Sequence, residues 1–393
     1  MKRILITGLA LLGLLQLSAQ NTPKDSSAYK NTKLKIEEIN LVSSFYQQDG
    51  NNSSVTGGIG TEKLTDVSNT IDVKFFKYDK AGIKHNWDVE VGIDHYSSAS
   101  SDMIDLQANS SASSADNRFY PSVTYSRENE AKGKSLSFGL SSSFEYDYQS
   151  FGGTIGFSKL TKNKNGEFIA KFQTYLDQVK MILPIELRGS SASNGTEARN
   201  TFAGSLGYSQ IVNKNFQLLF LVDIIQQNGY LSLPFHRVYF NDGTVHQENL
   251  PDSRFKLPIS VRGSYFLGDN VIIRGYYRYY TDNWQLNSHT LDLEVPVKLS
   301  PFMSISPFYR YYSQEGIKYF KGYEEHTAAS EFYTSNYDLS TFNSQFFGAG
   351  IKFTPLKGVF GIKHLNTLEI RYGHYTRTTP LTSNIISINL KYK

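Results

Sequence analysis

Residues 271–281, with the sequence VIIRGYYRYYT, decide the fold because their polarity alternates from one position to the next. From 271 to 279 every second residue is apolar, aromatic or glycine, and the positions between them include Arg274 and Arg278. A β-strand projects successive side chains to opposite faces, so this stretch predicts a strand with one apolar and one charged face. The apolar face would hold Val271, Ile273, Gly275, Tyr277 and Tyr279.

The same period of two recurs along the chain, clearly at 87–96 and 136–148, and predicts sixteen strands. Most of them exceed the roughly nine to eleven residues that a tilted strand needs to cross a bilayer. A barrel of fourteen strands, in which 37–47 or 150–162 is not a strand, stays open as an alternative. The predicted strands are 37–47, 64–79, 84–97, 118–128, 134–148, 150–162, 167–180, 199–212, 216–228, 253–267, 270–281, 285–299, 302–314, 342–354, 363–376 and 382–392.

The connections between these strands alternate in length, which indicates a barrel in a membrane. Short turns with residues such as Gly, Asn and Asp alternate with a set that contains every long excursion, at 48–63, 98–117, 181–198, 229–252 and 315–341. Outer-membrane barrels have short periplasmic turns and long extracellular loops. The pattern therefore predicts an all-β chain folded into a single closed antiparallel transmembrane β-barrel.

Residues 1–20 have the features of a secretory signal peptide. Lys2 and Arg3 precede an apolar run from Ile4 to Leu15, and small residues near Ala19-Gln20 offer a cleavage site. We expect residues 21–36 to form a periplasmic lead-in and residues 37–393 to form the barrel, in the cell outer membrane of a Gram-negative bacterium.

Composition agrees with this location. The chain has 27 tyrosines and 26 phenylalanines but a negative mean hydropathy, as expected when apolar lipid-facing residues alternate with polar lumen residues. It has no cysteine, which excludes a lipid-anchored lipoprotein and any disulfide. A formal net charge of +4 is too small to indicate a nucleic-acid partner.

Two groups of motifs resemble one known family. They are YRYYTDNW at 277–284, followed by Ser288-His289-Thr290 and by YRYYSQ at 309–314, and upstream PFHRV at 234–238 and ENLPDSR at 248–254. Over about residues 230–315 the chain resembles a Gram-negative family of outer-membrane barrels catalogued as a domain of unknown function (DUF3570). It departs from that pattern at Asn283, where a second aspartate is expected. The resemblance implies a barrel and no settled activity.

The sequence contains no metal-ligand spacing and no cofactor motif, so we expect no cofactor and no metal. Ser288 and His289 form the one tempting catalytic cluster. Consecutive strand residues point to opposite faces, so this pair cannot act as nucleophile and base. We therefore expect a protein that is not an enzyme.

If the polar face of each strand is turned to the lumen, the charged side chains form two oppositely charged arcs of the lumen wall. They could create a transverse field that selects small polar solutes, or they could form compensating pairs that keep the interior hydrated. The basic arc would hold Arg254, Lys256, Arg262, Arg274, Arg278 and Arg310. The acidic arc would hold Asp72, Asp88, Glu90, Asp94, Glu145 and Asp147.

A finer prediction is a charge ladder across three consecutive strands. A hairpin centred on Asn283 sets Arg274 opposite Asp292, and a turn centred on Pro301 sets Arg310 opposite the same Asp292, with Glu294 as a diagonal neighbour. On the opposite, lipid-facing side we expect an aromatic belt of Tyr277, Tyr279, Tyr309 and Tyr311 near the outer interface. The last strand would add Tyr392 to the lipid face.

Two functions remain open from the sequence. The first is a porin-like channel or transport component for small polar solutes, since sixteen strands can enclose an aqueous lumen. The second is a non-conducting scaffold whose extracellular loops or lumen bind a partner protein. A channel would have loops that fold inward, whereas a scaffold would have projecting loops or a filled lumen. In either case we expect contact with outer-membrane lipid and insertion by the outer-membrane assembly machinery.

Overall fold

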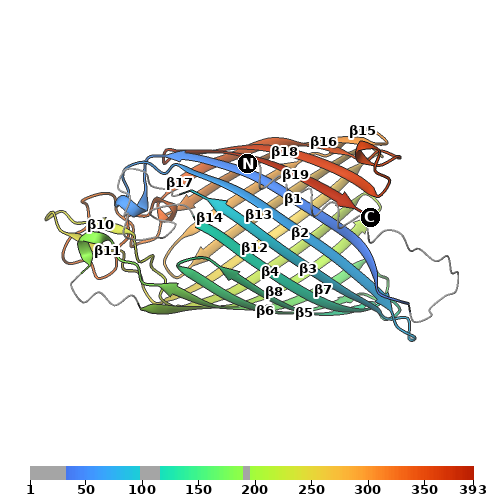
Figure 1. Ribbon diagram of the computed structural model, residues 1–393, viewed down its shortest axis with the longest axis horizontal. Coiled ribbons are helices and arrows are strands. Elements are labelled where there is room, and N and C mark those ends of the chain that lie inside the picture. The colour runs from blue at the N-terminus through green and yellow to red at the C-terminus, as the bar shows by residue number, and fades with distance from the viewer. Residues whose placement is uncertain (1–31, 98–115, 189–194) are drawn as a thin grey trace.

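The computed structural model describes residues 32–97, 116–188 and 195–393. The predicted signal peptide and most of the predicted lead-in lie outside the described residues. The described chain forms one closed antiparallel β-barrel of sixteen strands (Figure 1). The barrel begins at Lys35, two residues before the predicted boundary.

The strands coincide with the predicted ranges to within a few residues, so the fourteen-strand alternative is wrong. The first half of the barrel comprises β1 (Lys35–Gly50), β2 (Leu64–Tyr78), β3 (Lys84–Tyr96), β4 (Asp116–Asn129), β5 (Lys134–Phe144), β6 (Tyr148–Leu160), β7 (Gly166–Lys180), β8 (Thr196–Asn213) and β9 (Phe216–Gly229). The second half comprises β12 (Ser253–Leu267), β13 (Val271–Asp282), β14 (Asn287–Glu294), β15 (Val297–Ser300), β16 (Met303–Glu315), β17 (Phe342–Phe353), β18 (Leu365–Arg377) and β19 (Leu381–Tyr392).

β14 and β15 are two halves of one transmembrane strand, because both pair with β13 on one side and with β16 on the other. The break falls at Val295-Pro296. Proline has no N–H to donate to the ladder, so it interrupts the regular pairing there. The Pro296 carbonyl still accepts from the Ile272 N–H at 3.0 Å, which keeps the strand in place.

The last strand closes the barrel on the first. β19 pairs with β1 from Ile39–Tyr392 to Gly50–Leu381, and β1 also pairs with β2. Closure pairs each described barrel strand on both sides, which a hydrocarbon environment requires because it offers no hydrogen-bond partners.

The outward face of the barrel is apolar. Large side chains of a single parity are exposed on successive strands, with Leu140 at 69% and Leu206 at 64% exposure as the extremes. A closed antiparallel barrel with such a face is the architecture of outer-membrane proteins, and here it meets the lipid of the outer membrane.

Among the described residues, no helix is long and apolar enough to span a membrane. The helical content of the described ranges consists of four single-turn 3₁₀ segments, at Ser54–Thr56, Ile185–Leu187, Tyr337–Leu339 and Val359–Gly361.

The described parts of the long connections gather at one end of the barrel, together with a small hairpin of β10 (Arg237–Tyr239) and β11 (Val245–Gln247) (Figure 1). The C-terminus lies at the opposite end, which is therefore the periplasmic one. We call residues 51–63, 181–188, 230–252 and 316–341 the loop cap. Leu250 and Ile317 of the cap pack with Trp284 and Leu286 of the β13–β14 turn in one apolar cluster, which we call the cap cluster.

Candidate functional site

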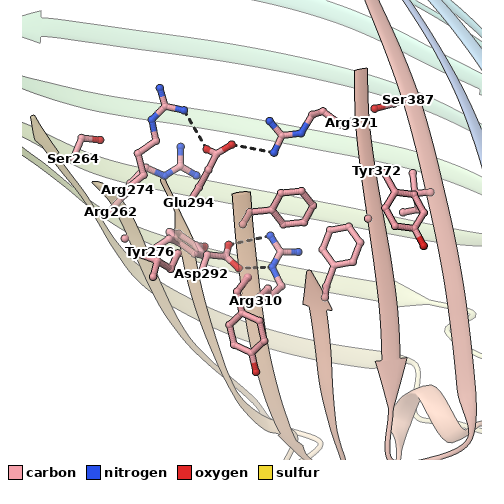
Figure 2. Close-up of a pocket in the computed structure, with 17 residues that line it drawn as sticks. Arg262, Ser264, Arg274, Tyr276, Asp292, Glu294, Arg310, Arg371, Tyr372 and Ser387 are labelled. Carbon is pink, nitrogen blue, oxygen red and sulfur yellow. Dashed lines mark hydrogen bonds and ion pairs between the residues drawn. The ribbon is translucent and has the colours of Figure 1, made fainter. Parts of the chain in front are cut away.

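The lumen face of β12 to β18 holds a group of charged side chains around a wall cavity of about 460 Å³ (Figure 2). The strand pairing brings these residues to the same height, since lumen-facing positions of neighbouring strands lie directly opposite one another. The charged residues that line the cavity are Arg262, Arg274, Asp292, Glu294, Arg310 and Arg371.

Two ion-pair groups organise this cavity. Glu294 lies between two guanidinium groups, accepting from Arg274 Nη1 at 3.1 Å and from Arg371 Nη2 at 2.9 Å. Arg310 forms a fork with Asp292 through its Nε and Nη2 atoms, with Nη2 at 2.9 Å from Oδ2. Figure 2 shows the Glu294 group above the Asp292–Arg310 pair.

The pairing of Arg310 with Asp292 follows the turn centred on Pro301. The expected pairing of Arg274 with Asp292 is wrong, because Arg274 lies opposite Glu294 and Asp292 lies opposite Tyr276. The β13–β14 turn is centred on Trp284, not on Asn283: the Asp282 N–H bonds to the Leu286 carbonyl. This shift moves each partner by two positions, so every charge keeps its face of the sheet.

The remaining members of the predicted basic arc lie nearer the extracellular end and outside the cavity. Arg254 donates to Asp282 at 2.8 Å through Nε and stacks on the Trp284 ring at 4.3 Å, which fixes it in the wall. Lys256 lies opposite Asp282 in the β12–β13 register. Arg278 lies between Ser260 and Thr290.

The predicted acidic arc lies on a different part of the wall and is largely satisfied by local partners. Asp72 accepts from Asn40 Nδ2 at 2.8 Å, and Asp94 accepts from the Tyr120 hydroxyl at 2.9 Å. Asp88 lies opposite Lys74 in the register, and Glu90 lies opposite Asp72.

Two members of that arc are not strand residues. β5 ends at Phe144, four residues before its predicted end at 148, so Glu145 and Asp147 lie in the short β5–β6 connection. Glu145 accepts from the Tyr96 hydroxyl at 2.6 Å and lies 3.6 Å from Arg118 Nε.

The predicted belt residues lie on the outward face. Tyr277, Tyr309 and Tyr311 are exposed there. The Tyr277 hydroxyl hydrogen-bonds His289 Nδ1 at 2.8 Å, and the Tyr279 ring lies 5.2 Å from the His289 ring. Tyr392 packs against the ring of His364, with centroids 5.6 Å apart.

His289 and Ser288 illustrate the alternation of the strand. Ser288 is buried, whereas His289 is exposed and belongs to the outward aromatic group. The two side chains therefore lie on opposite faces of β14. Within the described ranges, no group of three or more His, Cys, Asp or Glu side chains is arranged to hold a metal ion.

Sequence reasoning missed Arg371, which is central to the cavity. It reaches across β17 and β16 to Glu294 and also contacts Glu369 Oε1 at 3.2 Å. The signal was present, since Glu369 and Arg371 alternate with the outward residues Ile370 and Tyr372. A ladder drawn only between directly adjacent strands could not include a pair that skips two strands.

The loop cap contains a second group of polar residues that sequence reasoning missed. Ser54 Oγ lies 3.0 Å from His236 Nε2, and His236 Nδ1 lies 3.6 Å from Glu248 Oε1. Glu248 also accepts from the Leu233 N–H at 2.8 Å and from Thr334 Oγ1. Burial raises the pKa of Glu248, but His236 and these hydrogen bonds outweigh it and hold the pKa below its usual value. This network fastens loops together.

Arg237, the next residue, fastens three segments of the cap. Its guanidinium forks onto Glu186, with Nη2 at 3.0 Å from Oε2, and its Nη1 donates to the Val55 carbonyl at 2.8 Å. Phe240 and His326 join the hairpin to the 316–341 loop through a backbone bridge. The cap is therefore a packed structure and not a set of independent loops.

The cap is also hydrogen-bonded to residues of the lumen wall. Gln314 Nε2 donates to the Asp338 carbonyl at 2.9 Å and to the Ser340 carbonyl at 2.6 Å. Gln48 Nε2 donates to the Glu62 carbonyl at 3.0 Å. Both glutamines are lumen-facing residues near strand ends, so these two loops are fastened to the rim of the lumen wall where they join their strands.

Comparisons with solved structures give porin-type barrels of low sequence identity. The chain is similar to a BenF-like porin from Pseudomonas fluorescens Pf-5, with 11% identity and a TM-score of 0.44 over 91% of this chain and 98% of that chain. It is similar to OccK2 (OpdF) of Pseudomonas aeruginosa, with 8% identity and a TM-score of 0.41 over 90% and 97%. It is also similar to a deltaS2 mutant of the TodX monoaromatic hydrocarbon channel, with 10% identity and a TM-score of 0.38 over 93% and 90%.

Among curated proteins, none matches the chain. A family model described as "Protein of unknown function (DUF3570)" matches residues 6–380, which is nearly the whole chain. The motifs at 234–254 lie mostly in the loop cap, and those at 277–314 lie mostly in the charged lumen wall. This outer-membrane β-barrel belongs to the DUF3570 family.

Proposed function

We propose that the chain forms a water-filled channel of the outer membrane that admits small polar solutes. The observation that carries the proposal is the lumen wall, which bears charged and polar side chains on both arcs around cavities of about 460 and 510 Å³. Barrels of sixteen to eighteen strands leave an aqueous channel, whereas barrels of about eight strands are filled by their own side chains.

The fastening of the cap to the lumen wall supports a channel over a docking scaffold. Loops that dock a partner would be free of the wall, but several described cap residues bond to lumen-facing residues at its rim. Arg377 shows this best: its side chain is only 3% exposed and contacts Asp338 and Glu62, one from each of two cap segments. Charged side chains at the mouth are a common means by which a pore restricts what passes.

The same proposal includes export by the signal peptide at 1–20 and insertion by the outer-membrane assembly machinery. The lipid-facing strand β19, which ends with Leu390 and Tyr392, would be presented to that machinery. Binding of a partner protein to the cap stays the alternative function, and no described contact favours it.

Planar-bilayer recording of the purified protein tests the proposal. We expect stepwise conductance in KCl from protein whose folded state is verified by heat-modifiable mobility in gel electrophoresis. Removal of cap residues 316–341, replaced by a short turn, should raise the unitary conductance because it opens the mouth. Folded, reconstituted protein that passes no current, with or without that deletion, would contradict the channel.

A further inference from the structure

We infer that the cavity between β12 and β18 is a binding site for small organic anions, in particular carboxylates that carry an apolar body. The inference rests on the proposed channel, because a solute moving through the lumen would meet this cavity. It names the class of solute that the cavity would retain.

The cavity has a surplus of positive charge. Four guanidinium groups line it, from Arg262, Arg274, Arg310 and Arg371, against the two carboxylates of Asp292 and Glu294. Glu369 contacts Arg371 from beside the cavity, so the surplus is one positive charge. Arginine stays protonated at any physiological pH, so all four positive charges persist throughout that range. A solute anion would therefore be attracted where a cation would be repelled.

Exposure makes the surplus available to a solute. The side chains of Arg274 and Arg310 are 47% and 50% exposed, whereas those of their partners Glu294 and Asp292 are 23% and 24% exposed. The carboxylates thus lie closer to the wall and the guanidinium groups lie over them. A solute in the lumen meets cations first, which is the opposite of a wall of fully compensated pairs.

The guanidinium groups also retain unused donors. Arginine has five N–H donors in a planar fork that matches a carboxylate. Arg274 uses Nη1 for Glu294. Arg262 stacks on the Tyr276 ring at 5.3 Å, and within the part of the chain that the structure describes no carboxylate forms an ion pair with it. Arg262 is therefore the cation best placed to accept a new anionic partner.

Aromatic rings form the apolar side of the same cavity. Phe308 and Phe346 lie together, with ring centroids 5.2 Å apart, and the Arg371 guanidinium lies 5.1 Å from the Phe308 ring. Glycines make room for them, since a Cβ at Gly373 would come within 2.5 Å of the Phe346 ring. A charged fork beside an apolar surface suits an anion with a hydrocarbon or aromatic body better than a bare inorganic ion.

The opposite wall offers a contrasting environment. Its cavity is lined mainly by hydroxyl and amide side chains, together with Glu90, Asp177 and one arginine, Arg118. Arg118 lies 3.6 Å from Glu145 and 3.9 Å from Asp94. An arginine on this wall therefore provides a matched control for arginines in the proposed site.

Calorimetric titration of the detergent-solubilised protein with three probes tests the chemistry. Benzoate carries both the charge and the body, benzamide lacks the charge, and acetate lacks the body. We expect benzoate to bind at least about tenfold more tightly than either of the others, as expected for loss of one charged hydrogen bond or of a buried ring. Equal binding of benzoate and benzamide would overturn the inference.

Two substitutions test the location. Arg262→Gln removes a cation without leaving a carboxylate unpaired. Arg371→Gln leaves Glu294 held by Arg274 and removes the contact to Glu369. We expect each to weaken benzoate binding about tenfold, while Arg118→Gln leaves it unchanged. Wild-type affinity in both cavity variants, with folding verified by heat-modifiable mobility, would end the proposal.

Conductance of the same preparations separates this inference from the channel itself. Protein that conducts but binds no benzoate refutes the anion site and leaves the channel. Protein that binds benzoate but never conducts refutes the channel and leaves the binding site.

Discussion

At the scale of single residues, a lumen glycine sets how closely two strands approach. A Cβ added at Gly348 would lie 1.9 Å from the Tyr372 carbonyl oxygen on β18, an atom that cannot move without disturbing the strand pairing. We expect Gly348→Ala to destabilise the barrel by about 1–3 kcal/mol, the usual cost of overpacking. The measurement is the urea midpoint for loss of the folded gel band.

Gly275→Ala is the matched control, because a Cβ there would meet nothing within 4 Å. Equal midpoints for the two alanine variants would show that the close approach at Gly348 is not a constraint.

A buried histidine makes the loop cap sensitive to acid. His326 is 1% exposed, its Nε2 lies 3.0 Å from the Thr334 carbonyl, and burial lowers its pKa. The unfolded loop therefore binds a proton more readily than the folded cap does. The contribution of His326 to cap stability is present above its unfolded pKa, about 6.5, and is lost as the pH falls below that value.

Trp284 fluorescence can follow this transition, since Trp284 is 2% exposed in the cap cluster and the other tryptophan, Trp87, can be replaced by phenylalanine. We expect a red shift of the emission between about pH 7 and pH 5. His326→Gln should abolish that shift, because glutamine cannot take up the proton. An unaltered shift in this variant would assign the acid response to another group.

At the scale of elements, the contacts of Arg237 with Glu186 and the Val55 carbonyl, which we call the Arg237 clasp, hold the hairpin β10–β11 to two other cap segments. The Arg237 side chain is 4% exposed, and Glu186, which it contacts, is 32% exposed. We expect Arg237→Gln to destabilise the cap by about 2–4 kcal/mol, somewhat less than the loss of a fully buried partner. Limited proteolysis should then cut within the loops while the barrel stays folded.

Lys63→Gln is the control for that experiment. Lys63 and Asp49 form an exposed pair at 3.8 Å, with side chains 65% and 58% exposed, so its loss should change the proteolysis little. Matching cleavage patterns in the two variants would argue against the clasp.

The elements also show where sequence reasoning succeeds and where it stops. Strands were predictable because each carries its own period of two, which does not depend on the rest of the chain. The β13–β14 turn was not, because the Asp282 carboxylate accepts from the N–H groups of Trp284 and Leu286, and the indole joins the cap cluster. Because the indole packs in that cluster, the turn is centred on Trp284, one residue beyond the predicted centre at Asn283.

The cap was beyond prediction for the same reason. One of its hydrogen bonds joins Arg237 to the Val55 carbonyl, 182 residues away in the sequence, and no local sequence pattern predicts such a contact. The site was predictable in part, because parity placed Arg274, Arg310, Asp292 and Glu294 on one face. The contact of Arg371 with Glu294 was not, because it depends on which side chains reach past two strands along the wall.

At the scale of the whole molecule, closure of the barrel requires one face for lipid and one for water, and β19 offers adjacent residues that test this. Ile388 is 40% exposed on the outward face, next to Ile370 of β18, whereas Asn389 lies opposite Glu369 on the lumen face. We expect Ile388→Lys to reduce the assembled fraction in the outer membrane, because a lysine facing lipid costs about 2–4 kcal/mol at the midplane and less nearer the interfaces. Asn389→Lys should assemble normally, since its ammonium group is hydrated and can pair with Glu369. The assembled fraction is measured by heat-modifiable mobility of membrane-inserted protein. The reverse ranking of the two lysine variants would contradict this arrangement. It would mean that the apolar face of the barrel lines the lumen and that the charged face meets the lipid.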